Sequence, residues 1–112
     1  MIDSYGFGRI VIDGRRYASD VIIFPDRVED RWWRKEGHQL SVEDIEEVLR
    51  ERPEVLVVGT GYSGLMRILS ETRERLASEG IQLIAENTQK ACKTYNRLHK
   101  SKRVVAALHL TC

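Results

Sequence analysis

The chain contains little proline, cysteine or aromatic residue and no long apolar run. Two of its 112 residues are proline, two are cysteine, and aromatic residues make up 7%. Two cysteines cannot build the disulfide framework of a small secreted domain, and no apolar stretch approaches the roughly 20 residues that cross a membrane. Met1 to Ser4 also lack the basic head and apolar run of a secretory signal. We therefore expect a soluble, cytoplasmic protein with no membrane association.

The length and apolar content are those of one globular domain. Apolar residues make up 42% of the chain, and a typical domain has roughly 100–150 residues. The apolar residues recur at regular spacing, which argues against disorder. No internal repeat and no long linker divides the chain, so we expect a single domain over residues 1–112.

Acidic residues are absent from the last quarter of the chain. All seventeen precede residue 87, together with twelve of the eighteen basic residues, and the last six basic residues follow it. Such a basic segment can attract nucleic acid, a phosphate ligand or an acidic protein, although a solvated helix face is the simpler interpretation. The net charge of only +1 makes nucleic acid the least favoured of these partners.

The first half predicts a β-hairpin and a helix. Apolar residues between positions 4 and 24 are interrupted at Asp13-Gly14, a pair typical of a tight turn between two strands. Residues 25–40 indicate a long irregular connection. Ser41 is a candidate helix N-cap, with Glu43 and Asp44 suited to the positive end of the helix dipole. The buried stripe of this helix is predicted at Val42, Ile45, Val48 and Leu49.

The second half predicts a β-α-β-α-β arrangement. The continuous apolar run Val55–Val58 is typical of a strand covered on both faces, and a helix follows to about Ser78. Residues 81–85 predict the next strand, residues 91–99 recur at helical spacing, and residues 104–110 predict a last strand. Crossover helices pack against the sheet, so the fold class is α/β. The opening hairpin either extends this sheet or packs nearby as a small layer.

Residues Gly59 to Gly64 match the pattern G-x-G-x-x-G after a strand, and Glu86 lies near the spacing of a ribose-binding acid. A dinucleotide site needs a helix that begins among these glycines. Ser70 is an equally good helix start, which would leave residues 65–69 extended, and no second βαβαβ half follows. A structural turn is the favoured interpretation, a small-anion pocket is the next, and we expect no bound cofactor.

The sequence fixes no catalytic or metal-binding group. His109 and Cys112 have a metal-like spacing, but two ligands do not make a zinc site, and the other candidates lie in separate elements. Ser63 or Cys112 would need an adjacent base to act as a nucleophile, and no spacing enforces that contact. We expect no metal, and we favour a protein that is not an enzyme.

Two adjacent tryptophans stand among basic residues. Trp32 and Trp33 lie beside Arg31, Arg34 and Lys35, a composition that can stack a nucleobase or anchor a protein partner. Adjacent tryptophans more often have one ring buried and the other half exposed, and this is the interpretation we favour.

Together these segments resemble a small domain-of-unknown-function family. Its members include the human adipogenesis-associated protein, a mitochondrial complex I assembly factor, and archaeal and bacterial single-domain proteins. The resemblance covers nearly the whole chain, and its marks are Tyr5-Gly6-Phe7-Gly8, Asp13-Gly14, Trp33-Arg34, Gly37-His38, Val58-Gly59-Thr60-Gly61, Thr88 with Ala91, Tyr95-Asn96 with Leu98, and residues 103–112. The chain departs from the family at Gly64 and Met66, where the family does not keep a G-x-G-x-x-G pattern.

The resemblance implies a three-layer α/β domain with a mixed central sheet, in which the helix after the glycine loop begins near Ser70. The family is known for assembly or regulation and not for a reaction, so function transfers poorly. The family-matching residues in predicted loops are the best candidates for a shared ligand-binding site: Trp33, Arg34, His38, Gly59, Thr60, Gly61, Tyr95 and Asn96. The same positions can also serve folding alone.

Two functions from different classes remain. The favoured one is a non-catalytic α/β module that binds a protein partner around Trp32-Trp33, or forms a homodimer. The alternative is an enzyme or sensor for a small phosphorylated or carboxylated ligand, in which the glycine loop donates hydrogen bonds and Arg34 or Arg67 supplies charge. In that alternative the hydrogen-bond donors are Gly59, Thr60, Gly61 and Ser63.

Overall fold

A mixed five-stranded sheet forms the centre of the molecule. The computed structural model describes all 112 residues, and the strands lie in the order β5-β4-β10-β7-β9. The bounds are Val28–Asp30 for β5, Val21–Ile23 for β4, Val104–His109 for β10, Val55–Thr60 for β7 and Gln82–Glu86 for β9. Strand β7 pairs in parallel with β10 and β9, whereas β4 pairs antiparallel with β10 and β5. This arrangement confirms the predicted α/β class with a mixed central sheet.

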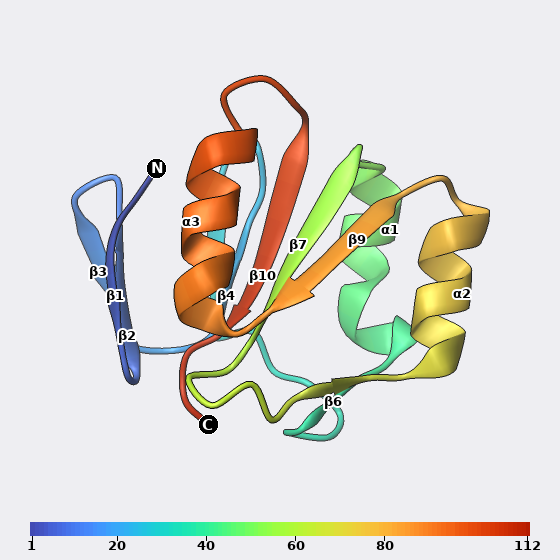
Figure 1. Cartoon of the computed structure of the whole chain (residues 1–112), viewed down its shortest axis with the longest axis horizontal. Helices are drawn as coiled ribbons and strands as arrows, with labels where there is room; N and C mark the ends of the chain where they lie inside the picture. The colour runs from blue at the N-terminus through green and yellow to red at the C-terminus, as the bar shows by residue number, and fades with distance from the viewer.

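Elements on both faces of the sheet complete three layers. Helix α3 (Thr88–Leu98) covers one face, and α1 (Glu46–Glu51) and α2 (Ser70–Ser78) cover the other (Figure 1). Successive residues of β7 point to opposite faces, so Val55 and Val57 enter the α3-side core, and Leu56 and Val58 enter the α1/α2-side core. Both cores are apolar, which explains the continuous apolar run of this strand.

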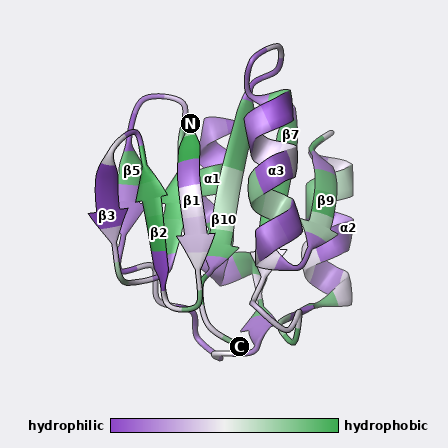
Figure 2. Cartoon of the chain, turned by 60° about the vertical axis from the view of Figure 1, so that its left-hand side comes forward, coloured by the Kyte–Doolittle hydropathy of each residue, from purple (hydrophilic) through white to green (hydrophobic).

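A small antiparallel sheet extends the α3 side. It contains β1 (Ile2–Gly6), β2 (Arg9–Ile12) and β3 (Arg15–Tyr17), and Asp13 and Gly14 form the predicted turn between β2 and β3 with positive φ angles of 50° and 81°. The sheet lies beside α3, whose solvent side is hydrophilic (Figure 2). Of the two placements left open for the hairpin, the separate small layer is the observed one for the part up to Tyr17, whereas its Val21–Ile23 part joins the central sheet.

The first helical segment begins at a local hydrogen bond, as its predicted N-cap requires. The Ser41 N–H and hydroxyl both donate to the Asp44 carboxylate at 2.9 Å, and this contact begins a 3-10 turn, η1 (Val42–Ile45), that leads into α1. Of the predicted stripe, Ile45, Val48 and Leu49 are buried and Val42 is partly buried. Helix α2 begins at Ser70, as the family resemblance implies, and not among the glycines.

Two interpretations of the first half require correction. Residues 17–23 do not form one strand, because the chain leaves the small sheet after Tyr17 and enters the central sheet at Val21. The connection 25–40 is not wholly irregular, since it contains β5 and the two-residue β6 (Gln39–Leu40), which pairs in parallel with β8 (Arg67–Ile68). No helix is long and apolar enough to span a membrane.

Candidate functional site

The two tryptophans of the loop between β5 and β6 occupy opposite environments. Trp32 is 8% exposed, and its Nε1–H donates to the carbonyl of Asp44 at 3.0 Å. Trp33 is 83% exposed, more than any other large hydrophobic residue of the chain. One ring therefore anchors the loop in the α1/α2-side core, and the other is presented to solvent.

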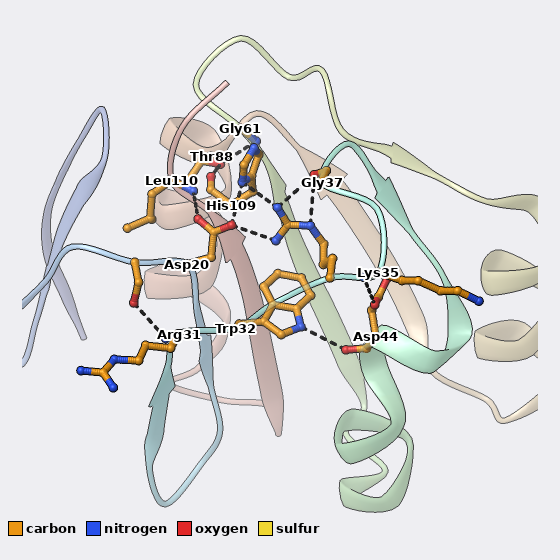
Figure 3. A network of polar contacts seen from close by, with 12 residues as sticks. Asp20, Arg31, Trp32, Lys35, Gly37, Asp44, Gly61, Thr88, His109 and Leu110 are labelled. Carbon is orange, nitrogen blue, oxygen red and sulfur yellow. Dashed lines mark hydrogen bonds and ion pairs between the residues drawn. The ribbon is translucent and has the colours of Figure 1, made fainter.

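Arg34, the residue after Trp33, lies in a buried polar network. Its Nη1 donates to Asp20 Oδ2 at 2.8 Å, and its Nε and Nη2 donate to the Gly37 carbonyl at 3.2 and 3.0 Å. The guanidinium also stacks over the Trp32 ring at 4.8 Å and lies 3.0 Å from His109 Nδ1. Figure 3 shows Asp20, Gly37 and His109 converging on this point. The side chains of Arg34, His109 and Asp20 are only 5%, 7% and 16% exposed.

Asp20 is the electrostatic centre of this network. Burial alone would raise the pKa of its carboxyl, but hydrogen bonds from His109, the Leu110 N–H and Arg34 outweigh burial and lower the pKa. The carboxyl is therefore ionised at neutral pH. His109 Nδ1 lies 2.8 Å from Asp20 Oδ2, which only accepts, and 3.0 Å from Arg34 Nη2, which only donates, so the ring tautomer decides which of the two hydrogen bonds this nitrogen makes. His109 Nε2 is buried and has no hydrogen-bond partner.

A cavity of about 340 Å³ opens beside the network. The exposed Trp33 ring and Arg31 border it, and Arg34 and His109 form part of its wall. Arg31 has a φ of 56°, and its N–H donates to the Ser19 hydroxyl at 2.8 Å. The loop thus presents Trp33 at the rim of a recess whose lining is mostly apolar surface, with Arg34 and His109 in its wall.

The glycine loop forms a closed turn. The Gly61 N–H donates to Thr88 Oγ1 at 2.9 Å, the Tyr62 N–H to the Thr111 carbonyl at 2.7 Å, and the Gly64 N–H to the Gly61 carbonyl at 3.1 Å. A Cβ on Gly61 would lie 2.5 Å from the Cys112 carbonyl oxygen. These donors already have partners within the fold, so the small-anion hypothesis finds no support in the loop's hydrogen bonds.

Some of the predicted site residues meet through His109. Gly59 and Thr60 lie at the end of β7, where Thr60 is the register partner of His109. Thr88 Oγ1 donates to the His109 carbonyl at 2.6 Å and accepts from Gly61, which links the glycine loop to the Arg34 network. The His38 ring lies 6.3 Å from the His109 ring in an edge-on arrangement.

The remaining predicted residues lie elsewhere. Ser63 is exposed in the turn, and Arg67 is exposed in β8 with its N–H bound to the His38 carbonyl at 2.8 Å. Asn96 binds the N–H and the carbonyl of Ile2 at 2.8 Å, and Tyr95 stacks on His99 at 4.8 Å. Asn96 therefore joins α3 to β1, whereas the Tyr95 ring stacks on the C-terminal end of its own helix.

Asp20, Thr88 and His109 were not among the predicted site residues. The sequence signal for His109 is one polar ring in the otherwise apolar run 104–110, and the signal for Asp20 is a carboxylate directly before Val21-Ile22-Ile23. Neither signal indicates that Asp20 and His109 contact each other in the folded protein. No group of three or more His, Cys, Asp or Glu side chains in the structure is arranged to hold a metal ion.

Comparison with known protein families matches residues 2–109 to a family described as "Protein of unknown function (DUF498/DUF598)". The human protein named NADH dehydrogenase (ubiquinone) 1 alpha subcomplex assembly factor 3 is 32% identical over 109 residues, which are 95% of this chain. The zebrafish (Danio rerio) protein of the same name is 32% identical over 110 residues, or 96% of this chain. The chain spans 58% and 62% of the lengths of these two relatives.

Among solved structures, the chain is similar to a conserved hypothetical protein from Pyrococcus horikoshii. The TM-score is 0.88 and the sequence identity is 31%, with 100% of this chain and 99% of that chain covered. The fold described above is therefore shared along the whole length of both chains.

Proposed function

Because the chain belongs to the DUF498/DUF598 family of proteins of unknown function, we propose that it is an assembly-type binding module whose partner is another protein. The names of the two relatives support this class of function, since each is an assembly factor. The chain covers less than two thirds of their length, so the proposal concerns a shared domain and not their complete function.

The exposed Trp33 ring is the observation that carries the proposal. A tryptophan that is 83% exposed leaves a large apolar surface in water, and such residues are the side chains that most often dominate binding energy at protein interfaces. The cavity beside the ring gives a partner side chain a place to enter. Trp33 and this recess form what we call the Trp33 surface, defined by Ser19, Asp20, Arg31, Trp33, Arg34 and His109.

The neighbours of Trp33 hold its backbone in place before any partner binds. Trp32 is fixed by its bond to Asp44, Arg34 by its bonds to Asp20 and Gly37, and the Lys35 N–H by Asp44 Oδ1 at 2.9 Å. A loop tied on both sides of the exposed ring loses little conformational entropy on binding. This preorganisation supports a binding role for the loop.

Affinity purification from cells that express the chain tests the proposal. We expect partners recovered with the wild-type protein to be lost with Trp33→Ala and retained with Trp33→Phe. Leu65→Ala is the matched control, because Leu65 is a 55% exposed apolar residue that does not line the cavity. Partners that survive Trp33→Ala would contradict the proposal, as would turnover in a broad substrate screen by a protein that recovers no partner.

A second copy of the chain is the other partner that the sequence suggests. Sedimentation of the purified protein separates the two cases, since a homodimer through the Trp33 surface would dissociate in Trp33→Ala. A reducing compartment such as the cytoplasm is part of the proposal and is supported by two cysteines that form no disulfide, Cys92 and Cys112. Cell fractionation tests that location.

A further inference from the structure

Strand β9 is an open edge of the central sheet. It pairs only with β7, and the Gln82 N–H donates to the Glu54 carbonyl at 3.0 Å on the β7 side. Since the backbone groups of successive strand residues point to opposite sides, the N–H and C=O of Leu83 and Ala85 point away from β7. Figure 1 shows β9 between α3 and α2 with no further strand beside it. Four backbone groups are thus available to another strand.

The β9 edge lacks the features that usually block strand addition. Protected edges are short or carry charged residues or proline. The opposite edge, β5, has three residues and includes Glu29 and Asp30. Strand β9 has five residues, and the first four, Gln82 to Ala85, include no charge and no proline.

The two cores are incomplete along this edge. Leu83 packs against the α1/α2-side core and Ile84 against the α3-side core, yet both remain only partly buried. A strand added beside β9 would cover both side chains. Removing this apolar area from water would contribute binding free energy in addition to that of the hydrogen bonds along the edge.

Cations of α3 stand over the same edge. Thr94 Oγ1 donates to Glu86 Oε1 at 2.6 Å, so this side of α3 faces β9. Lys90 and Arg97 are four residues before and three after Thr94, which places them on the same side of the helix. Both are exposed; Lys90 makes one ion pair, with Glu86 at 3.8 Å, and Arg97 makes none.

We propose that β9 accepts an extended acidic segment of a partner protein as a sixth strand of the central sheet. Backbone bonds to Leu83 and Ala85 hold the segment, as in other cases of strand addition, and Lys90 and Arg97 meet its carboxylates. The β9 surface, defined by Leu83, Ala85, Lys90 and Arg97, lies at the opposite edge of the sheet from β5 and the Trp33 loop that follows it. The inference goes beyond the proposed function and does not require the Trp33 surface.

Two other occupants fit the edge less well. A second copy that pairs its β9 antiparallel to form one continuous sheet would bring the two α3 helices to the same face, where their cations repel. Helix α3 contains no acidic residue to offset them. Nucleic acid would use the cations, but it would leave the free amide groups and the partly exposed Leu83 and Ile84 without partners.

A designed peptide tests the proposal directly. The probe is a fluorescent peptide of about ten residues, a normal strand length, in which valine alternates with glutamate. Matched peptides carry lysine or glutamine in place of glutamate. Fluorescence anisotropy should show the glutamate peptide binding about tenfold more tightly than the lysine peptide, with an advantage that shrinks at high salt.

Variants of the chain locate the peptide. Ala85→Pro removes an N–H that makes no bond within the fold, and Arg97→Glu reverses one charge; each should weaken binding about tenfold. Arg16→Glu, the same charge change at an exposed position of β3, should leave binding unchanged. The amides of Leu83 and Ala85 should exchange with solvent more slowly in the complex. If the Ala85→Pro protein does not fold, the Arg97→Glu variant and the amide exchange measurement still test whether the peptide binds at β9.

Several results would overturn the proposal. One is that the glutamate peptide binds no more tightly than the lysine peptide. Another is that amide exchange at β9 is the same with and without peptide. A third is that Trp33→Ala weakens peptide binding as much as the β9-surface variants do. A wild-type dimer that Ala85→Pro dissociates would assign the edge to a second copy. A DNA oligonucleotide that binds in an Arg97-dependent way, when the glutamate peptide does not bind, would assign the cations to nucleic acid.

Discussion

At the scale of single residues, Asp20 holds the Trp33 loop to the central sheet. Its carboxylate joins Arg34 of the loop to His109 and the Leu110 N–H at the end of β10. A buried ion pair adds little net stability compared with apolar residues, but removal of one partner leaves the other charge uncompensated. We therefore interpret the network as a positioning device for Trp33.

Replacing Asp20 with asparagine should destabilise the protein by about 3 kcal/mol, because Arg34 would remain charged and buried. Chemical denaturation at neutral pH measures this loss. Glu43→Gln is the control, since Glu43 is a carboxylate in no ion pair, and it should change stability by less than about 0.5 kcal/mol. An Asp20→Asn protein as stable as the wild type would contradict the role given to the network.

The same residue predicts a pH dependence. The pKa of Asp20 is lowered in the folded state from its ordinary value of 3.8, so its contribution is present above that value and is lost as the pH falls through the lower folded-state pKa. The stability difference between the wild type and Asp20→Asn should therefore shrink as the pH falls below about 4. Denaturation curves over a pH series measure it, and a constant difference would contradict this prediction.

Gly61 should tolerate no side chain. Its φ is 111°, and a Cβ would meet the carbonyl oxygens of Cys112 and Thr111 at 2.5 and 2.8 Å. Gly61→Ala should therefore lower the free energy of unfolding by about 3 kcal/mol, from backbone strain and steric overlap together. Gly37→Ala is the control, because a Cβ there meets no atom within 4 Å, and it should unfold at nearly the wild-type temperature.

At the scale of elements, the segments that could be predicted are those in which buried positions give the sequence a regular apolar pattern. Strands β7 and β10 are apolar on both faces, and α3 has a clear apolar stripe, so each follows from its pattern. Strand β5 was missed because an edge strand can carry Glu29 and Asp30 without burying them. The break between β3 and β4 was missed because both flanking segments have strand-like composition, although they belong to different sheets.

Asn96 supplies the hydrogen bonds between α3 and β1. Its side chain binds both the N–H and the carbonyl of Ile2, as a further strand would. Asn96→Ala should cost about 2 kcal/mol and should speed amide exchange in β1 before the central sheet is affected. Arg97→Ala, at an exposed neighbouring position without an ion pair, should leave β1 exchange unchanged. Equal exchange in both variants would contradict the role assigned to Asn96.

At the scale of the whole molecule, the site exists only because distant segments fold together. Arg34 lies 14 residues from Asp20 and 75 from His109, and Asp20 lies 89 residues from His109. Such long separations along the chain contain no periodic signal. The composition around Trp33 therefore indicated a binding surface, but it did not indicate that Asp20 and His109 hold Arg34 beneath it. The interpretation of the glycine pattern as a turn agrees with the structure. It could be made from the sequence because Ser70 is a visible alternative start for the helix that follows the glycines.

The two cores share β7 and β10, so the molecule should unfold as one unit. In Trp33→Phe the only remaining tryptophan is Trp32, which reports the α1/α2-side core. Its fluorescence should change at the same denaturant concentration as the far-ultraviolet circular dichroism, which reports all elements. Separate transitions would show that the two sides of the sheet unfold independently.

Site-specific photo-crosslinking tests the proposed binding role most directly. A photoreactive phenylalanine analogue replaces Trp33 in cells that express the chain, and a parallel protein carries it at Arg73, an exposed position of α2. We expect a covalent adduct with a distinct protein from position 33 and none with that protein from position 73. The absence of any adduct at position 33, or the same adducts from both positions, would contradict a partner at the Trp33 surface.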